Sequence, residues 1–364
     1  MSRSLRGINR PFTIAVDANP LTRPSLTGTE VYARELARRL PAAGPEVEWV
    51  FYASRPGPAI PELDLTVLPG NRLWSQTRLP LELWQRRPDL FFAPSHVVPY
   101  LAPGRTLTVI HDLAFERFPD AYRSFDRWYL RRTTRWALRR CLLVLAVSES
   151  TRRDLVELYG ADPERVVVVH PGATPPPARL RVREARLTEL GVARPFALQV
   201  GRVEPRKNQS AALAAVERLP GLSLVSAGPI ADARLAGRLL ASGRARVLGR
   251  VEAGDLELLY RSASALIFPS LYEGFGFPIL EAMLRGLPVV TVRGSSLPEV
   301  GGEAALYAAA PDDVDGLADA LRSVIEDPGC RRRVVAAGRR QASRFSWDRT
   351  AAGVVQVIRG QLAR

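Results

Sequence analysis

The sequence predicts an α/β fold with two doubly wound parallel sheets in tandem. Short apolar runs, many rich in β-branched residues, alternate with longer amphipathic runs along the chain, which is the pattern of repeated βαβ units. Many of the short runs are apolar throughout, as parallel strands covered on both faces should be. The 364 residues suffice for two domains with sizeable cores.

We expect six strands in each half of the chain. In the first half, the expected strands are Phe12–Asp17, Glu48–Ala53, Leu90–Ala93, Thr106–Ile110, Leu142–Val147 and Val166–His170. In the second half, they are Phe196–Val200, Leu222–Ser226, Ala245–Leu248, Ala265–Pro269, Pro288–Val292 and Ala304–Tyr307.

A domain boundary is expected at His170–Pro177, where three consecutive prolines can continue neither a helix nor a central strand. We therefore expect an N-terminal domain over residues 1–172 and a C-terminal domain over residues 173–347. A terminal helix over residues 348–364 can pack back on the N-terminal domain. Ligands of doubly wound sheets bind outside the carboxyl ends of the strands, so the loops that follow strands deserve the closest reading.

Composition excludes several classes of protein. The two cysteines, Cys141 and Cys330, are too few for a disulfide scaffold or a cysteine-rich zinc site, and they suit a reducing compartment. The net charge of +14 favours polyanionic or phosphorylated partners. No apolar run approaches the roughly 18 residues of a membrane span, and Met1–Phe12 lacks the apolar core of a signal peptide. We expect a cytoplasmic protein, with peripheral binding to the inner face of the membrane left open.

Common nucleotide-binding and hydrolase motifs are missing from the sequence. It has no dehydrogenase glycine pattern after the first strand, no Walker A loop, no nucleophile elbow and no His-Glu-x-x-His. Asp313-Val314-Asp315 could hold a divalent cation, but it opens an expected helix over Gly316–Ile325, where acids favour the helix N-terminus. We therefore predict no metal site.

A glycine turn opens the first expected helix. Thr27–Glu30 follows the strand Phe12–Asp17 and precedes a helix expected over Val31–Leu40. Free backbone N–H groups around Gly28, at the positive end of the helix dipole, would suit a phosphate. A plain N-cap with glycine in the turn explains the pattern equally well.

A second loop, Gly201–Asn208, follows the strand Phe196–Val200 and contains Lys207, the only lysine of the chain. Arg202 offers a planar fork and Lys207 a compact charge, which together suit the two phosphates of a nucleotide diphosphate. A solvated basic loop is the alternative.

A third loop is the most specific. In Pro269–Met283, the carboxylates Glu273 and Glu281 flank Gly274-Phe275-Gly276-Phe277-Pro278. Glycines let a ligand approach the backbone closely, and proline suits the first turn of a helix. Two solvated acids at a helix entry, or a glycosidase pair, are the alternatives. The neighbouring basic loop favours binding of a sugar nucleotide over hydrolysis.

Glu273-x7-Glu281, with Gly201-Arg202 and Lys207-Asn208 upstream, resembles the retaining glycosyltransferases of family 4. The resemblance spans Val16 to Trp347 and implies the GT-B fold, in which two Rossmann-like domains face each other across a cleft. Four further stretches support it: Val109–Leu113, Ala146–Ser150, Leu248–Val251 and Ser296–Val300.

The resemblance also implies roles for the donor side. Arg202 and Lys207 would neutralise the diphosphate leaving group, and Glu273 would hold hydroxyls of the transferred sugar. Glu281 would hold the ribose, and Val251 would edge the pocket for the base. The loop Gly274–Gly276, with Phe275 at its centre, would bind the donor.

On the N-terminal side, Gly28 would lie against the phosphates and His111 would contact the donor sugar near the reacting carbon. The N-terminal loop that contains Gly28 has a single glycine, where many relatives have two. His111 could instead be a satisfied core histidine, and His96 and His170 are expected to be structural. The resemblance implies retention of anomeric configuration and no metal or other cofactor.

An arginine stripe stands apart from these motifs. Its members, which recur every four residues with Trp128, Tyr129 and Trp136 nearby, are Arg127, Arg131, Arg135 and Arg139. Such a helix can dock on anionic lipid, or its aromatic residues can pack on the sheet beneath a solvated arginine face. Many relatives act on lipid-linked acceptors.

The stretch Leu73–Pro80 resembles bacterial mannosyl- and rhamnosyltransferases of surface polysaccharide assembly. We therefore expect transfer of a hexose from a nucleotide-diphospho-sugar, with GDP-mannose favoured, to a glycan or lipid-linked acceptor. A sugar-nucleotide epimerase or phosphorylase of related fold is one alternative. A basic nucleic-acid-binding protein is another, but the basic residues are dispersed and no nucleic-acid-binding motif occurs.

Overall fold

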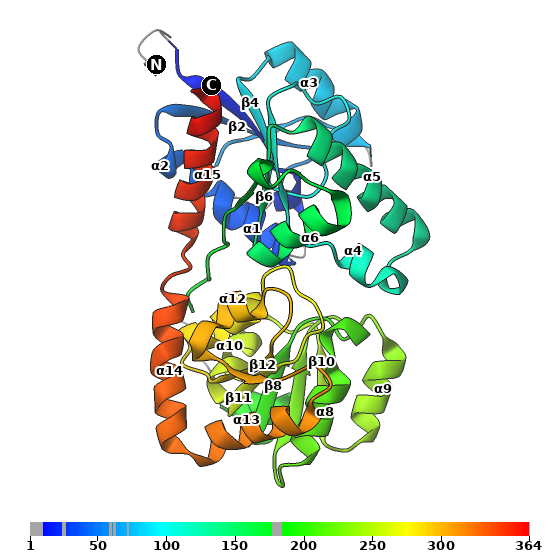
Figure 1. Ribbon diagram of the computed structural model, residues 1–364, viewed down its shortest axis with the longest axis vertical. Coiled ribbons are helices and arrows are strands. Elements are labelled where there is room, and N and C mark those ends of the chain that lie inside the picture. The colour runs from blue at the N-terminus through cyan, green and yellow to red at the C-terminus, as the bar shows by residue number, and fades with distance from the viewer. Residues whose placement is uncertain are drawn as a thin grey trace. The chain divides into compact units, whose positions relative to one another are not determined.

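The computed structural model describes residues 10–23, 27–57, 60, 63–70, 73–176 and 184–363 (Figure 1). It divides the chain into two compact units. The first unit contains residues 1–172 and 346–364, and the second contains residues 173–345. The ends of the expected domains at Met1 and Arg364, and Pro177 of the expected linker, lie outside the described residues.

The first unit is built on a seven-stranded parallel sheet with the order β3-β2-β1-β4-β5-β6-β7. Its strands are β1 (Phe12–Asp17), β2 (Val47–Ala53), β3 (Leu65–Val67), β4 (Leu90–Ala93), β5 (Thr106–Ile110), β6 (Leu143–Ala146) and β7 (Val166–Val168). The edge strand β3 was not expected, because three half-exposed residues carry too little apolar pattern to stand out. β7 ends two residues before the expected end at His170.

The helices of the first unit connect these strands, and one of them comes from the end of the chain. They are α1 (Gly28–Ala37), α2 (Leu40–Ala43), α3 (Arg78–Arg86), α4 (Ala114–Arg117), α5 (Ser124–Arg140), α6 (Glu149–Tyr159) and α15 (Trp347–Leu362), with 3-10 turns η1 (Asn19–Thr22), η2 (Trp74–Gln76), η3 (Pro119–Ala121) and η4 (Pro163–Arg165).

The terminal helix α15 packs against α1 and α2. Arg39 Nε lies 2.9 Å from Asp348 Oδ1, and Arg359 Nε lies 2.7 Å from Glu46 Oε1. Thr350 Oγ1 donates to the carbonyl oxygen of His170 at 2.8 Å. Residues from the two ends of the sequence therefore share one hydrophobic and polar interface within the first unit.

The second unit is built on a six-stranded parallel sheet with the order β10-β9-β8-β11-β12-β13. Its strands are β8 (Phe196–Val200), β9 (Ser223–Ala227), β10 (Ala245–Gly249), β11 (Ala265–Phe268), β12 (Val289–Val292) and β13 (Leu306–Ala308). Its helices are α7 (Ala185–Glu189), α8 (Gln209–Glu217), α9 (Ala233–Ala241), α10 (Ala253–Ser262), α11 (Phe277–Leu284), α12 (Leu297–Gly301), α13 (Val314–Glu326) and α14 (Pro328–Ala342), with 3-10 turns η5 (Pro205–Lys207) and η6 (Gly302–Ala304).

In both sheets the strand order reverses direction at one point, between β1 and β4 in the first unit and between β8 and β11 in the second. Loops leaving the sheet at such a point diverge to opposite faces and leave room for a ligand outside the carboxyl ends of the strands. The loop after β8 contains Lys207, and the loop after β11 contains Glu273. The two most specific sequence motifs thus lie together at the switch point of the second sheet.

The acidic pair of the Asp313-Val314-Asp315 motif is used at a helix terminus. Asp313 is the N-cap of α13, and its carboxylate accepts from the Gly316 N–H at 2.9 Å and the Ala309 N–H at 3.0 Å. The helix begins at Val314, two residues before the expected start. Among the described residues, no group of three or more His, Cys, Asp or Glu side chains is arranged to hold a metal ion. In the same residues, no helix combines the length and apolarity needed to span a membrane.

Candidate functional site

The loops after β8 and β11 are joined by backbone hydrogen bonds and by Arg206. The Leu271 N–H donates to the Arg206 carbonyl at 2.9 Å, and Arg206 Nη1 donates to the Tyr272 carbonyl at 2.7 Å. Asn208, at φ +56°, sends its Nδ2 to the carbonyl oxygens of Pro269 and Pro311 at 3.2 and 2.7 Å. These contacts fix the two loops as one structural unit.

Two buried glutamines hold the β8 loop from below. Gln199 Nε2 donates to the Lys207 carbonyl at 2.7 Å, and Gln209 Nε2 donates to the Arg202 carbonyl at 2.9 Å. Both side chains belong to residues that are almost fully buried. Because a buried N–H donor without a partner is costly, these two bonds favour the observed loop path, although the Oε1 atoms of both glutamines are buried without a partner.

A buried ionic cluster lies at the meeting of the two loops. Lys207 Nζ contacts the Glu273 carboxylate, to which Ser270 Oγ donates at 2.5 Å and Arg206 Nη1 lies at 3.5 Å. Arg206 also pairs with Glu204 at 2.7 Å. The side chains of Lys207 and Glu273 are only 13% and 11% exposed, so their charges interact with little screening by water.

The electrostatics keep Glu273 ionised. Burial by itself raises the pKa of this carboxyl, but the charges of Lys207 and Arg206 and the hydrogen bonds it accepts bring the pKa below its ordinary value. The carboxylate therefore carries a full negative charge at neutral pH and can accept further hydrogen bonds.

The structure separates Arg202 from this cluster. Arg202 is 54% exposed, and its guanidinium reaches Glu204 only at 4.0 Å. Arg206, which the sequence argument passed over, occupies the central position instead. Its signal was present in the Pro205-Arg206-Lys207 run, but a lone arginine among fifty carries little information.

The glycine-rich loop after β11 is held by two serines that follow β12. Ser295 Oγ accepts from the Glu273 N–H at 2.9 Å, and Ser296 Oγ donates to the Glu273 and Phe275 carbonyls at 3.0 and 2.7 Å. The Phe275 ring is buried and packs edge-on against Phe345. Sequence reasoning named Ser296 only as part of a supporting stretch and passed over Ser295, since the contacts of both serines with Glu273 exist only through the sheet.

Gly274 and Gly276 are buried beside Phe275, and Gly276 ends the loop at φ +111°, a conformation that favours glycine. Helix α11 begins at the next residue. The motif therefore forms a tight turn that leads from Glu273 into the first turn of α11.

Glu281 lies on α11 in a different environment from Glu273. Tyr260 Oη donates to Glu281 Oε2 at 2.7 Å. The Arg285 guanidinium lies 4.9 Å from the Tyr260 ring centroid and bonds to the Glu257 carboxylate at 2.6 Å. The two carboxylates of the motif are thus supported by separate networks, one cationic and one centred on a tyrosine.

Close packing of backbone aligns the loops after β8, β9 and β10. The Gly201 N–H donates to the Ala227 carbonyl and the Gly228 N–H to the Gly249 carbonyl. A Cβ atom on Gly228 would lie 2.1 Å from the Gly201 carbonyl oxygen. Val251 follows β10 and is half-buried at the same edge of the sheet.

In the first unit, the turn at Gly28 forms a complete capping box. Thr27 is the N-cap, and its N–H donates to Glu30 Oε2 at 2.9 Å. Glu30 also pairs with Arg23 at 2.6 Å. Helix α1 therefore begins at Gly28, three residues earlier than the expected Val31, and Gly28 itself is exposed.

His111 follows β5 and is held as a neutral ring. Its Nε2 lies 3.1 Å from the Pro94 carbonyl oxygen, and its ring meets Tyr32 edge-on at 4.9 Å. Burial lowers the pKa of His111. Since a carbonyl only accepts, Nε2 carries the hydrogen and Nδ1 is left with its lone pair.

The other two histidines have structural contacts. His96 Nε2 lies 2.5 Å from Thr134 Oγ1, and burial together with nearby His111 lowers the pKa of His96 to about 3. The His170 carbonyl accepts from Thr350 on α15.

The arginine stripe of α5 is only partly engaged by neighbouring residues. Arg131 Nε bonds to Glu116 Oε1 on α4 at 2.9 Å, and Arg127 is half-buried. Arg135 and Arg139 are exposed, although the Arg135 guanidinium lies 5.8 Å from the Tyr159 ring centroid.

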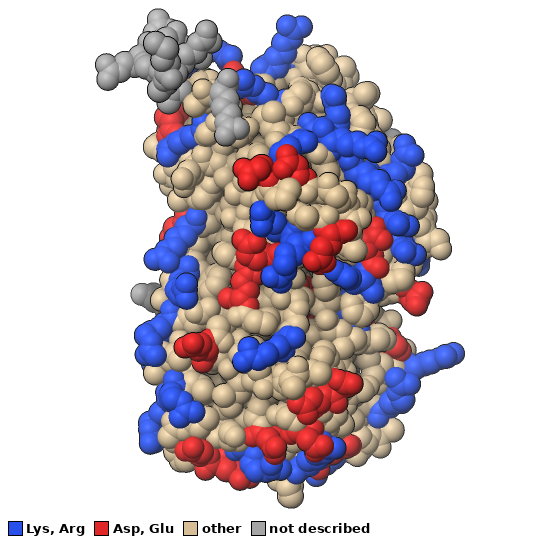
Figure 2. Space-filling view, in the orientation of Figure 1, with Lys and Arg blue, Asp and Glu red and all other residues tan. Residues whose placement is uncertain are grey.

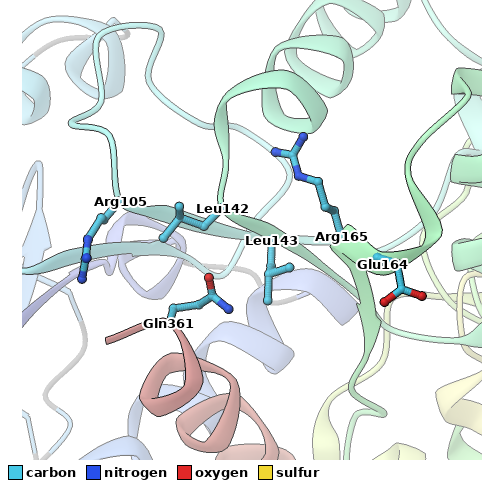
Figure 3. Close-up of a pocket in the computed structure, with 6 residues that line it drawn as sticks. All are labelled: Arg105, Leu142, Leu143, Glu164, Arg165 and Gln361. Carbon is cyan, nitrogen blue, oxygen red and sulfur yellow. The ribbon is translucent and has the colours of Figure 1, made fainter. Parts of the chain in front are cut away.

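A hollow of about 500 Å³ lies at the opposite edge of the first sheet from His111 (Figure 3). Arg105, Leu142 and Arg165 each stand just before a strand, so the hollow opens at the amino ends of β5, β6 and β7. It contains none of the predicted site residues. Its full lining is Arg105, Leu142, Leu143, Glu164, Arg165 and Gln361.

Both halves of the chain match models of known protein families. Residues 26–175 match the model described as Glycosyltransferase Family 4, and residues 186–341 match the model described as Glycosyl transferases group 1. The chain is 31% identical to the O-antigen chain mannosyltransferase B of Escherichia coli over 277 residues, which cover 71% of each chain.

Other likenesses cover less of the chain or share less sequence identity. The chain is 34% identical to a glycogen synthase of Mycobacterium tuberculosis over 235 residues, which cover 61% of this chain and 55% of that protein. The solved structure of Anabaena Alr3699/HepE in complex with UDP-glucose matches with a TM-score of 0.73 at 18% identity, covering 96% of this chain and 100% of that one. This structural likeness concerns the fold, two Rossmann-like domains of the GT-B type.

Proposed function

We propose that this chain, which belongs to the glycosyltransferases of family 4 and group 1, transfers a hexose with retention from a nucleotide-diphospho-sugar to a glycan or lipid-linked acceptor. Glycosyltransferase activity follows from the family. The donor, the acceptor and the stereochemistry are the parts we propose.

The single observation that carries the donor site is the buried cluster of Lys207, Arg206 and Glu273 at the switch point of the second sheet. A departing nucleoside diphosphate develops negative charge, and preorganised cations stabilise that charge most strongly where water is scarce. We assign that task to Lys207 and to the more exposed Arg202. Arg206 is a positioning residue, because it ties the β8 loop to the loop that contains Glu273.

Glu273 has two tasks in this proposal. Without a donor, its charge compensates Lys207 and keeps the cluster from carrying unpaired cations. With a donor bound, the phosphates take over part of that compensation, and the carboxylate accepts hydrogen bonds from hydroxyls of the sugar. Glu281 would similarly accept from the ribose, with its rotamer held by Tyr260, and Val251 and Gly274–Gly276 would complete the donor pocket.

On the first unit we assign His111 to the donor sugar and Gly28 to the phosphates. The neutral His111 ring presents Nδ1 as a hydrogen-bond acceptor, which suits a sugar hydroxyl better than an anion. Gly28 is exposed at the first turn of α1, where a ligand can reach the backbone.

We propose that the reaction needs no metal ion or other cofactor, because Arg202 and Lys207 supply the positive charge that the leaving group requires. GDP-mannose is the favoured donor. The relative from Escherichia coli is named as a mannosyltransferase, and Leu73–Pro80 resembles enzymes of that kind. A UDP-sugar is the competing donor, since Alr3699/HepE was solved with UDP-glucose.

Thermal stabilisation by GDP, UDP, ADP and dTDP tests the donor site directly. We expect one diphosphate to raise Tm, also in the presence of EDTA, and we expect Lys207→Ala to remove most of the shift. Arg238→Ala, an exposed arginine on α9, is the matched control and should keep it. No shift with any diphosphate, or an equal shift in Lys207→Ala, would contradict the proposed site.

A further inference from the structure

A second buried ionic cluster lies between α10 and α11 of the second unit. Glu257 on α10 is its centre, because its side chain is 1% exposed and each of its carboxylate oxygens binds one arginine. Arg261, one turn further along α10, has its Nε 2.6 Å from Glu257 Oε1. Arg285, the residue after α11, has its Nε 2.6 Å from Glu257 Oε2. The cluster therefore joins the two helices that precede and follow β11 in the chain.

Arg285 is held in place on several sides. Figure 2 shows many Lys and Arg side chains at the surface of the molecule, but only 10% of the Arg285 side chain is exposed. Its guanidinium lies 4.9 Å from the Tyr260 ring centroid, and its Nη1 donates to the Glu281 carbonyl oxygen at 2.9 Å. Because a buried cation is costly unless it is paired, Glu257 fixes where this guanidinium lies.

Helical spacing favours a different partner for Arg285. Glu281 precedes it by four residues, and a glutamate four residues before a cation is well placed to form an ion pair along a helix. In the structure, Arg285 pairs with Glu257 instead, and the Glu281 carboxylate accepts from Tyr260 Oη at 2.7 Å. The phenol stays neutral, because burial and the Glu281 charge raise the pKa of Tyr260. Arg285 thus lies beside Glu281 without occupying its carboxylate.

We propose that Glu257 is a positioning residue that keeps Arg285 off the Glu281 carboxylate, so that this carboxylate stays available to the ribose hydroxyls of the donor. The proposal rests on the role given to Glu281 under the proposed function. A carboxylate has about four acceptor sites, of which Tyr260 uses one. A guanidinium can pair with both carboxylate oxygens at once. Arg285, if released from Glu257, would therefore compete with the ribose for Glu281.

A purely structural role for Glu257 makes a different prediction. Buried ion pairs often stabilise a fold no more than well-packed apolar residues do, so the cluster is a poor choice for tying α10 to α11 alone. If Glu257 were only such a tie, replacing both Glu257 and Arg285 would be at least as harmful as replacing Glu257. If Glu257 keeps Arg285 off Glu281, it is no longer needed once the arginine is gone.

Titration calorimetry of the full chain with GDP and with 2′,3′-dideoxy-GDP, which lacks both ribose hydroxyls, tests the proposal. We expect the wild type to bind GDP more tightly than the dideoxy compound by about tenfold or more, because hydrogen bonds to a charged group are strong. Glu257→Gln should remove most of this ratio by weakening GDP, and should raise donor KM with little change in kcat. If UDP is the diphosphate that stabilises the wild type, the corresponding uridine compounds are used.

Removing Arg285 separates the two roles. Glu257→Gln with Arg285→Met should regain most of the ratio, because no cation is left to occupy Glu281, and Arg285→Met alone should keep it. Glu257→Asp, which keeps the charge on a shorter side chain, should lie between the wild type and Glu257→Gln, and it takes the place of Glu257→Gln if that variant does not fold.

A control and a direct observation complete the test. Asp255→Asn weakens another ion pair of α10, with Arg186, and should bind both compounds as the wild type does. A crystal structure of Glu257→Gln without nucleotide should show the Arg285 guanidinium within about 4 Å of the Glu281 carboxylate. This observation does not depend on any ligand.

Any of three results would overturn the proposal. A Glu257→Gln variant with the wild-type ratio, or with Arg285 still away from Glu281, would show that the two do not compete. A double variant no better than Glu257→Gln would reduce Glu257 to a tie between helices. Loss of the ratio in Arg285→Met alone would mean that Arg285 itself supports ribose binding.

Failure of the proposed function would be seen earlier, in the wild type itself. The unchanged chain would then bind neither compound, or it would bind both equally, before any residue is replaced. The role of Glu257 in ribose binding would fall with it. A wild type that prefers GDP, combined with one of the three results above, contradicts the role of Glu257 alone.

Discussion

The two units share one architecture but differ in where their charged side chains lie. In the second unit, the loops at the switch point enclose a buried ionic cluster of Lys207, Arg206 and Glu273. In the first unit, the corresponding edge holds a neutral histidine, and six of the eight arginines of α3 and α5 are exposed. The same scaffold therefore encloses charged side chains where its loops are cross-linked and exposes them where its helices face solvent.

The largest expected effect comes from breaking the buried cluster. Glu273→Ala leaves Lys207 buried without its counter-charge, while Arg206 keeps Glu204, and should lower the free energy of unfolding by about 3–5 kcal/mol. Chemical denaturation measures it. Asp319→Ala, which breaks an exposed pair with Arg322, should change it by less than about 1 kcal/mol. Equal losses of unfolding free energy in the two variants would contradict the expectation that a buried ion pair matters more to stability than an exposed one.

Backbone packing beneath the donor loops gives the next effect. Gly228→Ala places a Cβ 2.1 Å from the Gly201 carbonyl oxygen at φ +152° and should destabilise the chain by about 3 kcal/mol while displacing the β8 loop. Gly237→Ala, in open space within α9, should instead stabilise by about 0.5–1 kcal/mol. Denaturation curves and the Tm shift with diphosphate are the measurements. A tolerated Gly228→Ala would contradict the close packing of the two loops.

The first unit contains a buried acid with the opposite electrostatics from Glu273. Burial is the main cause that raises the pKa of Asp17 to about 6, against the lowering effects of the Asn19 N–H and Arg23. The folded chain holds this proton where the unfolded chain has released it, so this group's contribution to stability falls as pH rises from about 4 to about 6.

Asp17→Asn keeps an oxygen that can accept from Asn19 and removes the titration. We expect its stability relative to the wild type to improve by about 2 kcal/mol between pH 4 and pH 7. Unfolding free energies across this range, measured for both proteins, provide the check. A difference that does not change with pH would mean that Asp17 is charged in the folded chain at all these values.

The smallest expected effect tests whether Glu281 has a different role from Glu273. Tyr260→Phe removes the hydrogen bond to Glu281 but keeps the ring beneath Arg285, so the diphosphate should bind about tenfold more weakly with little change in kcat. Titration calorimetry and donor KM measure it. Tyr307→Phe, which removes a 2.7 Å hydrogen bond to the Gly302 carbonyl, should leave diphosphate affinity and donor KM unchanged. A fall in kcat without weaker binding would place Glu281 nearer the chemistry than the ribose.

Sequence patterns predicted the positions of most helices and strands but not which side chains would meet. Ten of the thirteen strands among the described residues begin and end within one residue of the expected runs. The agreement is good because a strand buried on both faces must be apolar along its length, as β4, β5, β11 and β12 are. The short edge strand β3 has no such requirement and escaped notice. The start of α1 was misplaced because the capping box of Thr27 and Glu30 begins the helix before its apolar face does.

The sequence by itself determined the two doubly wound halves and the places of the basic and acidic motifs after β8 and β11, because each depends on local periodicity or on residues close together in the chain. Only the tertiary structure decided which side chains meet. It placed Arg206 beside Glu273 and left Arg202 exposed, and it brought Ser295 and Ser296 into contact with the glycine-rich loop. Such contacts form when strands far apart in sequence become neighbours in a sheet, and local sequence patterns do not predict which strands those are.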